Sequence, residues 1–73
     1  MDYVVIVSGD SVGIEVKLFS TYEKALADVL DDIFGPGYDT ADEQVAAVSE
    51  ALETEGYYDD NGIEYQIREE VVR

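Results

Sequence analysis

The chain begins with an almost unbroken run of apolar, mostly β-branched residues from Tyr3 to Ser8. Such a run is typical of a strand that neighbours cover on both sides or that lies centrally in a sheet. Turn-forming residues follow at 8–11. Polarity then alternates, with Val12, Ile14, Val16 and Leu18 separated by Gly13, Glu15 and Lys17. The period of two predicts a second strand, which forms a hairpin with the first.

Two amphipathic helices are predicted in the middle of the chain. Ser20-Thr21-Tyr22-Glu23 fits a capping box, in which a hydroxyl and a carboxylate satisfy free amides at a helix start. The first helix should end at Gly35-Pro36-Gly37. Thr40-Ala41-Asp42-Glu43 repeats the capping pattern and begins a second helix that ends near Gly56. The apolar stripe of the second helix is predicted at Ala41, Val45, Val48 and Leu52.

The last predicted element is a strand in which Ile63, Tyr65 and Ile67 alternate with polar residues. Asp59-Asp60-Asn61-Gly62 supplies the turn before it, across which Tyr57 and Tyr58 are expected to pair only briefly. Residues 1–73 are therefore predicted to form a single α+β domain in the order ββααβ. Two helices should pack on one face of a three-stranded sheet, with Tyr3–Ser8 central and the strands carrying Lys17 and Arg68 at the edges.

Composition removes several classes of function. The chain has no cysteine and no histidine, which excludes disulfides, zinc fingers and imidazole catalysis. Asp2 stands where a secretory signal would carry basic residues, and no run reaches the roughly 18 apolar residues that span a bilayer. A cytoplasmic protein is expected, in the host cell cytoplasm if a phage encodes it.

Acidic residues suggest two kinds of chemistry that the spacing does not support. Asp59-Asp60-Asn61-Gly62 resembles a calcium loop, but Ile63 and Glu64 then stand where the loop needs a ligand and a glycine. Paired carboxylates can act as acid and base only when their surroundings separate their pKa values, and no pair is singled out here. We therefore expect no enzyme activity, no metal and no cofactor.

Net charge is the most unusual property of the chain. Eighteen Asp and Glu residues oppose four Lys and Arg, giving a formal charge of -14. Solubility requires a magnitude of only about 2 to 8 in a small domain. Such a charge repels nucleic acid and anionic membranes, so the sequence predicts a partner that is itself basic.

The predicted partner-binding residues combine acids with neighbouring tyrosines. Asp42, Glu43, Glu50 and Glu53 are expected on the second helix opposite its apolar stripe, and Asp28, Asp31 and Asp32 on the outer face of the first. Tyr57 and Tyr58 adjoin Asp59 and Asp60, a composition common at binding surfaces. The alternative for these two tyrosines is that they only cover the end of the core.

These features resemble the small acidic inhibitors of phages and other mobile elements, the DNA mimics that include anti-CRISPR and anti-restriction proteins. The resemblance rests on size, on the absence of cysteine and histidine, and on the array of Asp28, Asp31, Asp32, Asp42, Glu43, Glu50 and Glu53. Asp42 and Glu50 would stand about 12 Å apart along a helix. The resemblance implies an inhibitor that blocks the nucleic-acid-binding surface of a host defence complex or another DNA-binding protein.

Two other functions are compatible with the same composition. Scarce lysine and abundant valine, alanine and aspartate suit a halophilic accessory protein whose acids keep it hydrated in concentrated salt. An adaptor or antitoxin-like module that neutralises one basic protein would also be acidic. The sequence leaves open whether the chain is a monomer or a small homo-oligomer.

Overall fold

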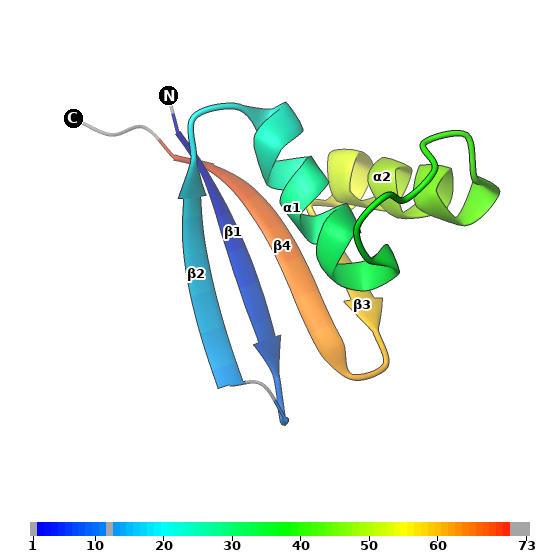
Figure 1. Ribbon diagram of the computed structural model, residues 1–73. Helices are drawn as coiled ribbons and strands as arrows, with labels where there is room; N and C mark the ends of the chain where they lie inside the picture. The colour runs from blue at the N-terminus through cyan, green and yellow to red at the C-terminus, as the bar shows by residue number, and fades with distance from the viewer. Residues whose placement is uncertain (1, 12, 71–73) are drawn as a thin grey trace.

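The computed structural model describes residues 2–11 and 13–70, which form a four-stranded antiparallel sheet and two helices (Figure 1). The elements in chain order are β1 (Asp2–Gly9), β2 (Gly13–Phe19), α1 (Tyr22–Phe34), α2 (Glu43–Glu55), β3 (Tyr57–Asp60) and β4 (Ile63–Glu70). The α+β class with two helices is confirmed, whereas the prediction of three strands in the order ββααβ is wrong. Val12, which was predicted in the second strand, lies outside the described residues.

The additional strand is β3, and a tight turn explains it. Asn61 and Gly62 both have positive φ, 49° and 82°, as the favoured two-residue hairpin turn requires. Asp60 therefore pairs with Ile63 and Asp59 with Glu64. Two of the acids predicted in the turn lie instead in a strand.

The strands lie in the order β2-β1-β4-β3. β1 is internal and the strand that carries Lys17 is at an edge, as predicted. The strand that carries Arg68 is internal, because β3 covers its outer side. The prediction of an edge position for that strand is therefore wrong.

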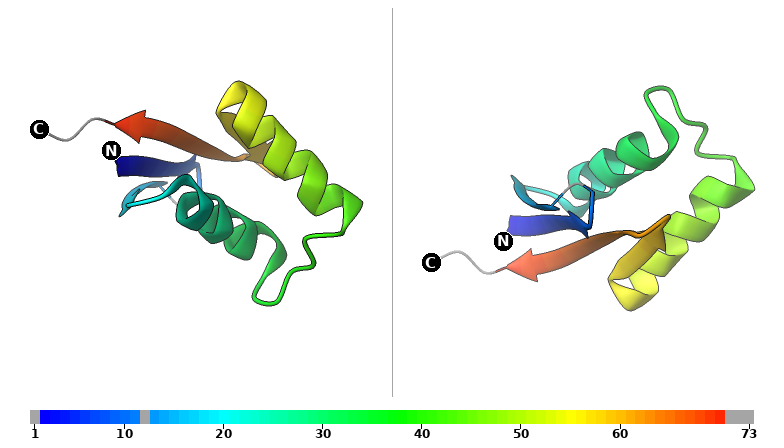
Figure 2. Two further views of the ribbon diagram at one scale, coloured as in Figure 1. Left: turned by 90° about the horizontal axis from the view of Figure 1, so that it is seen from above. Right: turned by 90° about the horizontal axis from the view of Figure 1, so that it is seen from below.

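Both helices cover the same face of the sheet (Figure 2). The core between them contains Val5 and Val7 of β1, Ala25, Val29 and Leu30 of α1, Val45, Val48 and Leu52 of α2, and Tyr65 and Ile67 of β4. Burying a large aliphatic side chain contributes about 1.5–3 kcal/mol, so this single layer of contacts is the main source of stability.

Both helices begin at a residue other than the predicted cap. Thr21, and not Ser20, caps α1 by accepting a hydrogen bond from the Lys24 amide at 3.2 Å. Asp42, and not Thr40, caps α2 by accepting from the Gln44 amide at 2.8 Å. Ala41 is consequently outside the helix and exposed, and not part of its apolar stripe. At the other ends, Gly35 and Gly56 are the C-caps, as the glycine pattern predicted.

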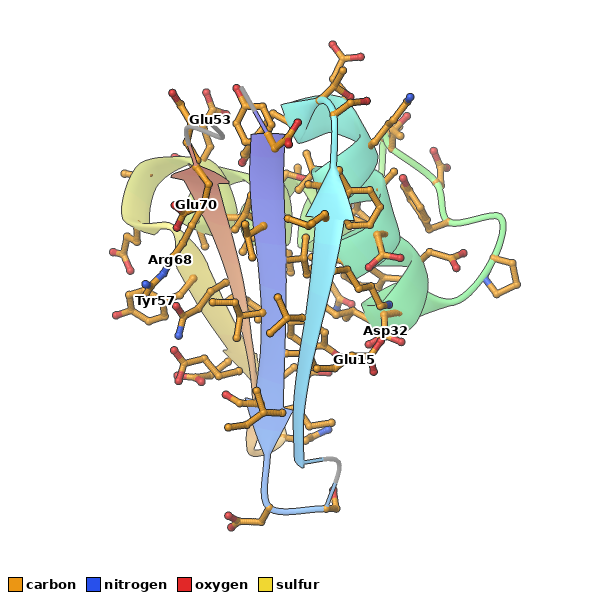
Figure 3. All side chains as sticks on the ribbon, turned by 90° about the vertical axis from the view of Figure 1, so that its left-hand side faces the viewer. Glu15, Asp32, Glu53, Tyr57, Arg68 and Glu70 are labelled. Atoms are coloured by element: carbon orange, nitrogen blue, oxygen red, sulfur yellow. The ribbon has the colours of Figure 1, made fainter. Side chains whose placement is uncertain are left out.

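The face of the sheet opposite the helices carries apolar side chains (Figure 3). Val5 and Val7 of β1 point into the core, so the period of two directs Val4 and Ile6 to the other side. Val4 pairs with Leu18 and Ile6 with Val16 of β2. The exposed fractions are 79% for Ile14, 60% for Val16 and 68% for Leu18.

Two tyrosines with contrasting surroundings join the helices to the sheet. The buried Tyr65 donates a hydrogen bond to Asp32 of α1 at 2.9 Å. The Tyr22 hydroxyl is buried and has no hydrogen-bond partner among residues 2–11 and 13–70. Its ring meets the Tyr3 ring edge-on, with ring centroids 5.8 Å apart.

Replacing these tyrosines with phenylalanine should have opposite effects. We expect Tyr65→Phe to lower the free energy of unfolding by about 0.5–1.5 kcal/mol, because it removes a net hydrogen bond. Tyr22→Phe should leave stability unchanged or raise it, because the hydroxyl that it removes is desolvated without compensation. Urea unfolding of both variants measures the difference. Equal losses in the two variants would show that Tyr22 has a partner in solution.

Stability should also fall at alkaline pH. Burial and then the Asp32 hydrogen bond raise the pKa of Tyr65 from 10.0 to about 12. The Asp28 hydrogen bond likewise raises the pKa of Lys17. In both cases the folded chain binds the proton more tightly, so the contribution is complete below pH about 10 and is lost as the pH rises. We expect the melting temperature to drop from pH 10 to 12 and to drop less in Tyr65→Phe; equal slopes would contradict this origin.

Candidate functional site

The exposed side of α2 carries three of the predicted acids, whose carboxylates form no ion pair within the described residues. Glu43, Glu50 and Glu53 are exposed, and between them stand small or uncharged residues. Glu43 and Glu50 are seven positions apart in the helix. Their backbone positions are therefore about 10 Å apart along the helix axis. Asp42 is also exposed, but its carboxylate caps the helix. Asp42 was predicted on the helix with the other three, whereas it is the N-cap residue immediately before α2.

Two of the three predicted acids of α1 have intramolecular partners. Asp28 accepts from the Lys17 ammonium group of β2 at 3.2 Å, and Asp32 accepts from Tyr65. Only Asp31 of this group is exposed without such a bond among the described residues. Asp28 and Asp32 therefore connect α1 to the sheet, Asp28 by an ion pair with β2 and Asp32 by a hydrogen bond with β4.

β3 divides its four candidate residues between two surfaces. Tyr57 and Asp59 pair with Gln66 and Glu64 and point to the open face; Figure 3 shows Tyr57 there, beside Arg68. Tyr58 and Asp60 point to the helices and are partly buried. The sequence placed these residues in one patch because it showed no strand at 57–60.

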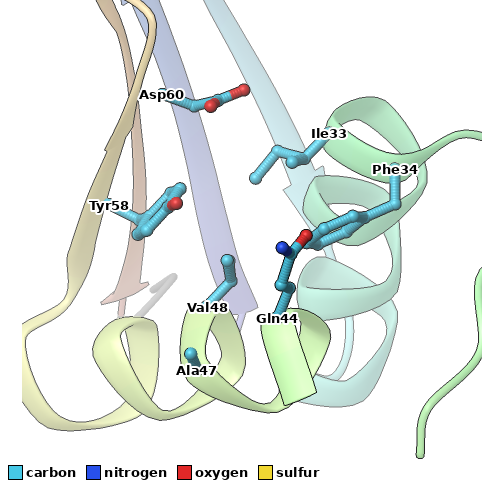
Figure 4. Close-up of a pocket in the computed structure, with 7 residues that line it drawn as sticks. All are labelled: Ile33, Phe34, Gln44, Ala47, Val48, Tyr58 and Asp60. Carbon is cyan, nitrogen blue, oxygen red and sulfur yellow. The ribbon is translucent and has the colours of Figure 1, made fainter. Parts of the chain in front are cut away.

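Tyr58 and Asp60 line a cleft that sequence reasoning did not predict. Its volume is about 350 Å³, and it lies between the end of α1, the first half of α2 and β3 (Figure 4). Its walls are Ile33, Phe34, Gln44, Ala47, Val48, Tyr58 and Asp60. Phe34, the last residue of α1, was the one visible signal in the sequence, because it is an aromatic residue directly before the glycine that ends the helix. Aromatic and aliphatic walls with one carboxylate suit a long cationic side chain.

Few cations balance the acids. In the described part of the chain, the ion pairs within 4 Å both involve Lys17, with Glu15 and with Asp28 at 3.2 Å each. The Lys24 ammonium group instead donates to Ser20, and the Arg68 Nε donates to Gln66. Most carboxylates thus remain available to an external cation.

Across residues 2–11 and 13–70, no group of three or more acids is arranged to hold a metal ion. No helix in the same ranges is long and apolar enough to cross a membrane.

Comparisons with protein-family models, with curated proteins and with solved structures found no match.

Moderate salt should raise the melting temperature, because unpaired carboxylates repel one another in the folded state. The rise between low salt and about 0.5 M should be gradual, as screening of many surface charges is. Differential scanning calorimetry of the free protein measures it. A melting temperature that is independent of salt would mean that the carboxylates are too far apart to repel.

Proposed function

We propose that this protein is a non-enzymatic inhibitor that binds the basic nucleic-acid-binding surface of a host defence complex, in the manner of an anti-CRISPR DNA mimic. Its site of action is then the host cell cytoplasm. The observation that carries the proposal is the row of exposed carboxylates on α2, Glu43, Glu50 and Glu53, none of which forms an ion pair within residues 2–11 and 13–70.

Unpaired carboxylates on a rigid helix suit a surface that normally binds phosphates. Duplex DNA presents one negative charge per roughly 1.7 Å of its axis, and proteins that bind it gather Lys and Arg. The helix fixes the spacing of the backbone positions that carry the α2 acids, so no ordering of the backbone opposes their binding. Electrostatic attraction of this kind chiefly increases the association rate.

The neighbouring cleft supplies a more specific contact. A partner's Arg or Lys can lay its aliphatic stem against Ile33 and Val48 while its charge meets Asp60 and the Tyr58 ring. Such a desolvated contact commonly dominates binding, with a loss of about 2 kcal/mol or more on truncation.

The test combines altered acids with a matched control. The α2 variant neutralises two acids and reverses two others: Asp42→Asn, Glu43→Gln, Glu50→Lys and Glu53→Lys. Asn at position 42 retains a capping oxygen. The control, Asp10→Asn, Glu23→Gln, Glu69→Lys and Glu70→Lys, changes the net charge equally at exposed residues elsewhere. Each protein is immobilised and exposed to host lysate at low salt, and the bound proteins are eluted with duplex DNA.

We expect wild type and control to retain the same DNA-eluted proteins, and the α2 variant to lose at least about tenfold in affinity for them. Equal loss in control and α2 variant would show that net charge alone acts. Retention unchanged in the α2 variant, or proteins that DNA does not elute, would contradict the mimic. Loss of circular dichroism at about 0.1 M salt, where the Debye length is about 10 Å, would favour the halophilic alternative instead.

A further inference from the structure

The outer edge of β2 is open for pairing. Within the described ranges, β2 pairs with β1 alone, and its seven residues from Gly13 to Phe19 form one end of the sheet. Such an edge presents a row of backbone amides and carbonyls that a further strand can bind. Proteins commonly protect it with charge, proline or a bulge. β2 contains one acid and one base but no proline and no bulge, and it exposes Ile14, Val16 and Leu18.

The sequence of β2 complements itself when reversed. An antiparallel partner strand centred on Val16 sets Val16 opposite Val16, Ile14 opposite Leu18, and Glu15 opposite Lys17. Residues opposite each other in such a pair project on the same side, with Cβ atoms about 4.5–5.5 Å apart. The apolar residues therefore meet on the open face, and two Glu15–Lys17 pairs form on the helix side.

We infer that two copies of this chain associate through their β2 strands, antiparallel and centred on Val16, to form one continuous eight-stranded sheet. This is an isologous two-fold contact. Each strand therefore supplies Glu15 to one of the two Glu15–Lys17 pairs and Lys17 to the other. Opposite charges facing each other stabilise strand pairing, and like charges oppose it.

The charge of the molecule agrees with this choice of edge. β2 contains one acid and one base, so its own net charge is zero within a chain of -14. β3, at the opposite edge, carries Asp59 and Asp60, which would meet a second pair of acids in a self-contact. β2 is therefore the edge at which a second copy encounters least repulsion.

The position of α1 also leaves space for the second copy. α1 begins beside the Phe19 end of β2, whereas the Gly13 end extends beyond both helices (Figure 1). A two-fold axis at Val16 brings the second copy's α1 to the uncovered half.

The experiment uses charge exchange and the purified full chain. Analytical ultracentrifugation over a wide concentration range, at about 0.5 M salt to screen the overall repulsion, gives the dimer dissociation constant. Glu15→Lys sets lysines opposite lysines and should raise that constant about tenfold or more. Adding Lys17→Glu, with Asp28→Lys to keep opposite charges between β2 and α1, should restore the wild-type value.

A control distinguishes this contact from stacking of the open faces. Ile6→Thr changes the open face on β1, the strand beside β2, but leaves every residue of β2 in place, and it should leave the dissociation constant unchanged. Loss of the dimer in Ile6→Thr with an intact dimer in Glu15→Lys would overturn edge pairing in favour of face stacking. A monomer at all concentrations and salts, or no rescue in a folded charge-exchanged variant, would overturn the inference as well. None of these outcomes bears on the α2 test.

Discussion

The constraint on which the structure depends is the two-residue period of β1. Val5 and Val7 must face the helices, because they form the floor of the core. The same period then directs Val4 and Ile6 outward, and the register fixes which residues of β2 lie beside them. Two helices suffice to cover one face of the sheet. The apolar half of the open face, on β1 and β2, is thus a direct consequence of placing an apolar strand inside the sheet of a two-layer domain.

The sequence predicted features that depend on local chemistry. The helices, the glycines that end them and the internal position of β1 follow from periodicity and from backbone preferences. The sequence indicated only a brief pairing of Tyr57 and Tyr58 and no strand over Tyr57–Asp60, because the segment is short and Asp59 and Asp60 are unfavourable in strands. Its pairing depends on the Asn61–Gly62 turn and on β4. Nor did the sequence reveal which side of β2 faces the helices, since that depends on contacts such as Lys17 with Asp28.

The candidate site was also predicted only in part, because the sequence predicts features of local periodicity and not bonds between distant residues. The acids of α2 are exposed, as helical periodicity predicted for Glu43, Glu50 and Glu53. The roles of Asp28, Asp32 and Asp42 were missed because each depends on a specific bond to Lys17, Tyr65 or the Gln44 amide. Composition gives the number of charges on a chain. Only the fold distinguishes carboxylates that hold the protein together from those that remain for a partner.

The β1–β4 ladder also determines how the chain must fold. β1, β2 and α1 contact one another locally, and β3 contacts both α2 and β4, so each half can form early. The sheet closes only when Asp2 meets Glu70, almost the full length of the chain apart. Contacts of such sequence separation are slow, because loop-closure entropy opposes them until many form together. Joining the two halves is therefore the late and cooperative step, and neither half has a complete core before it.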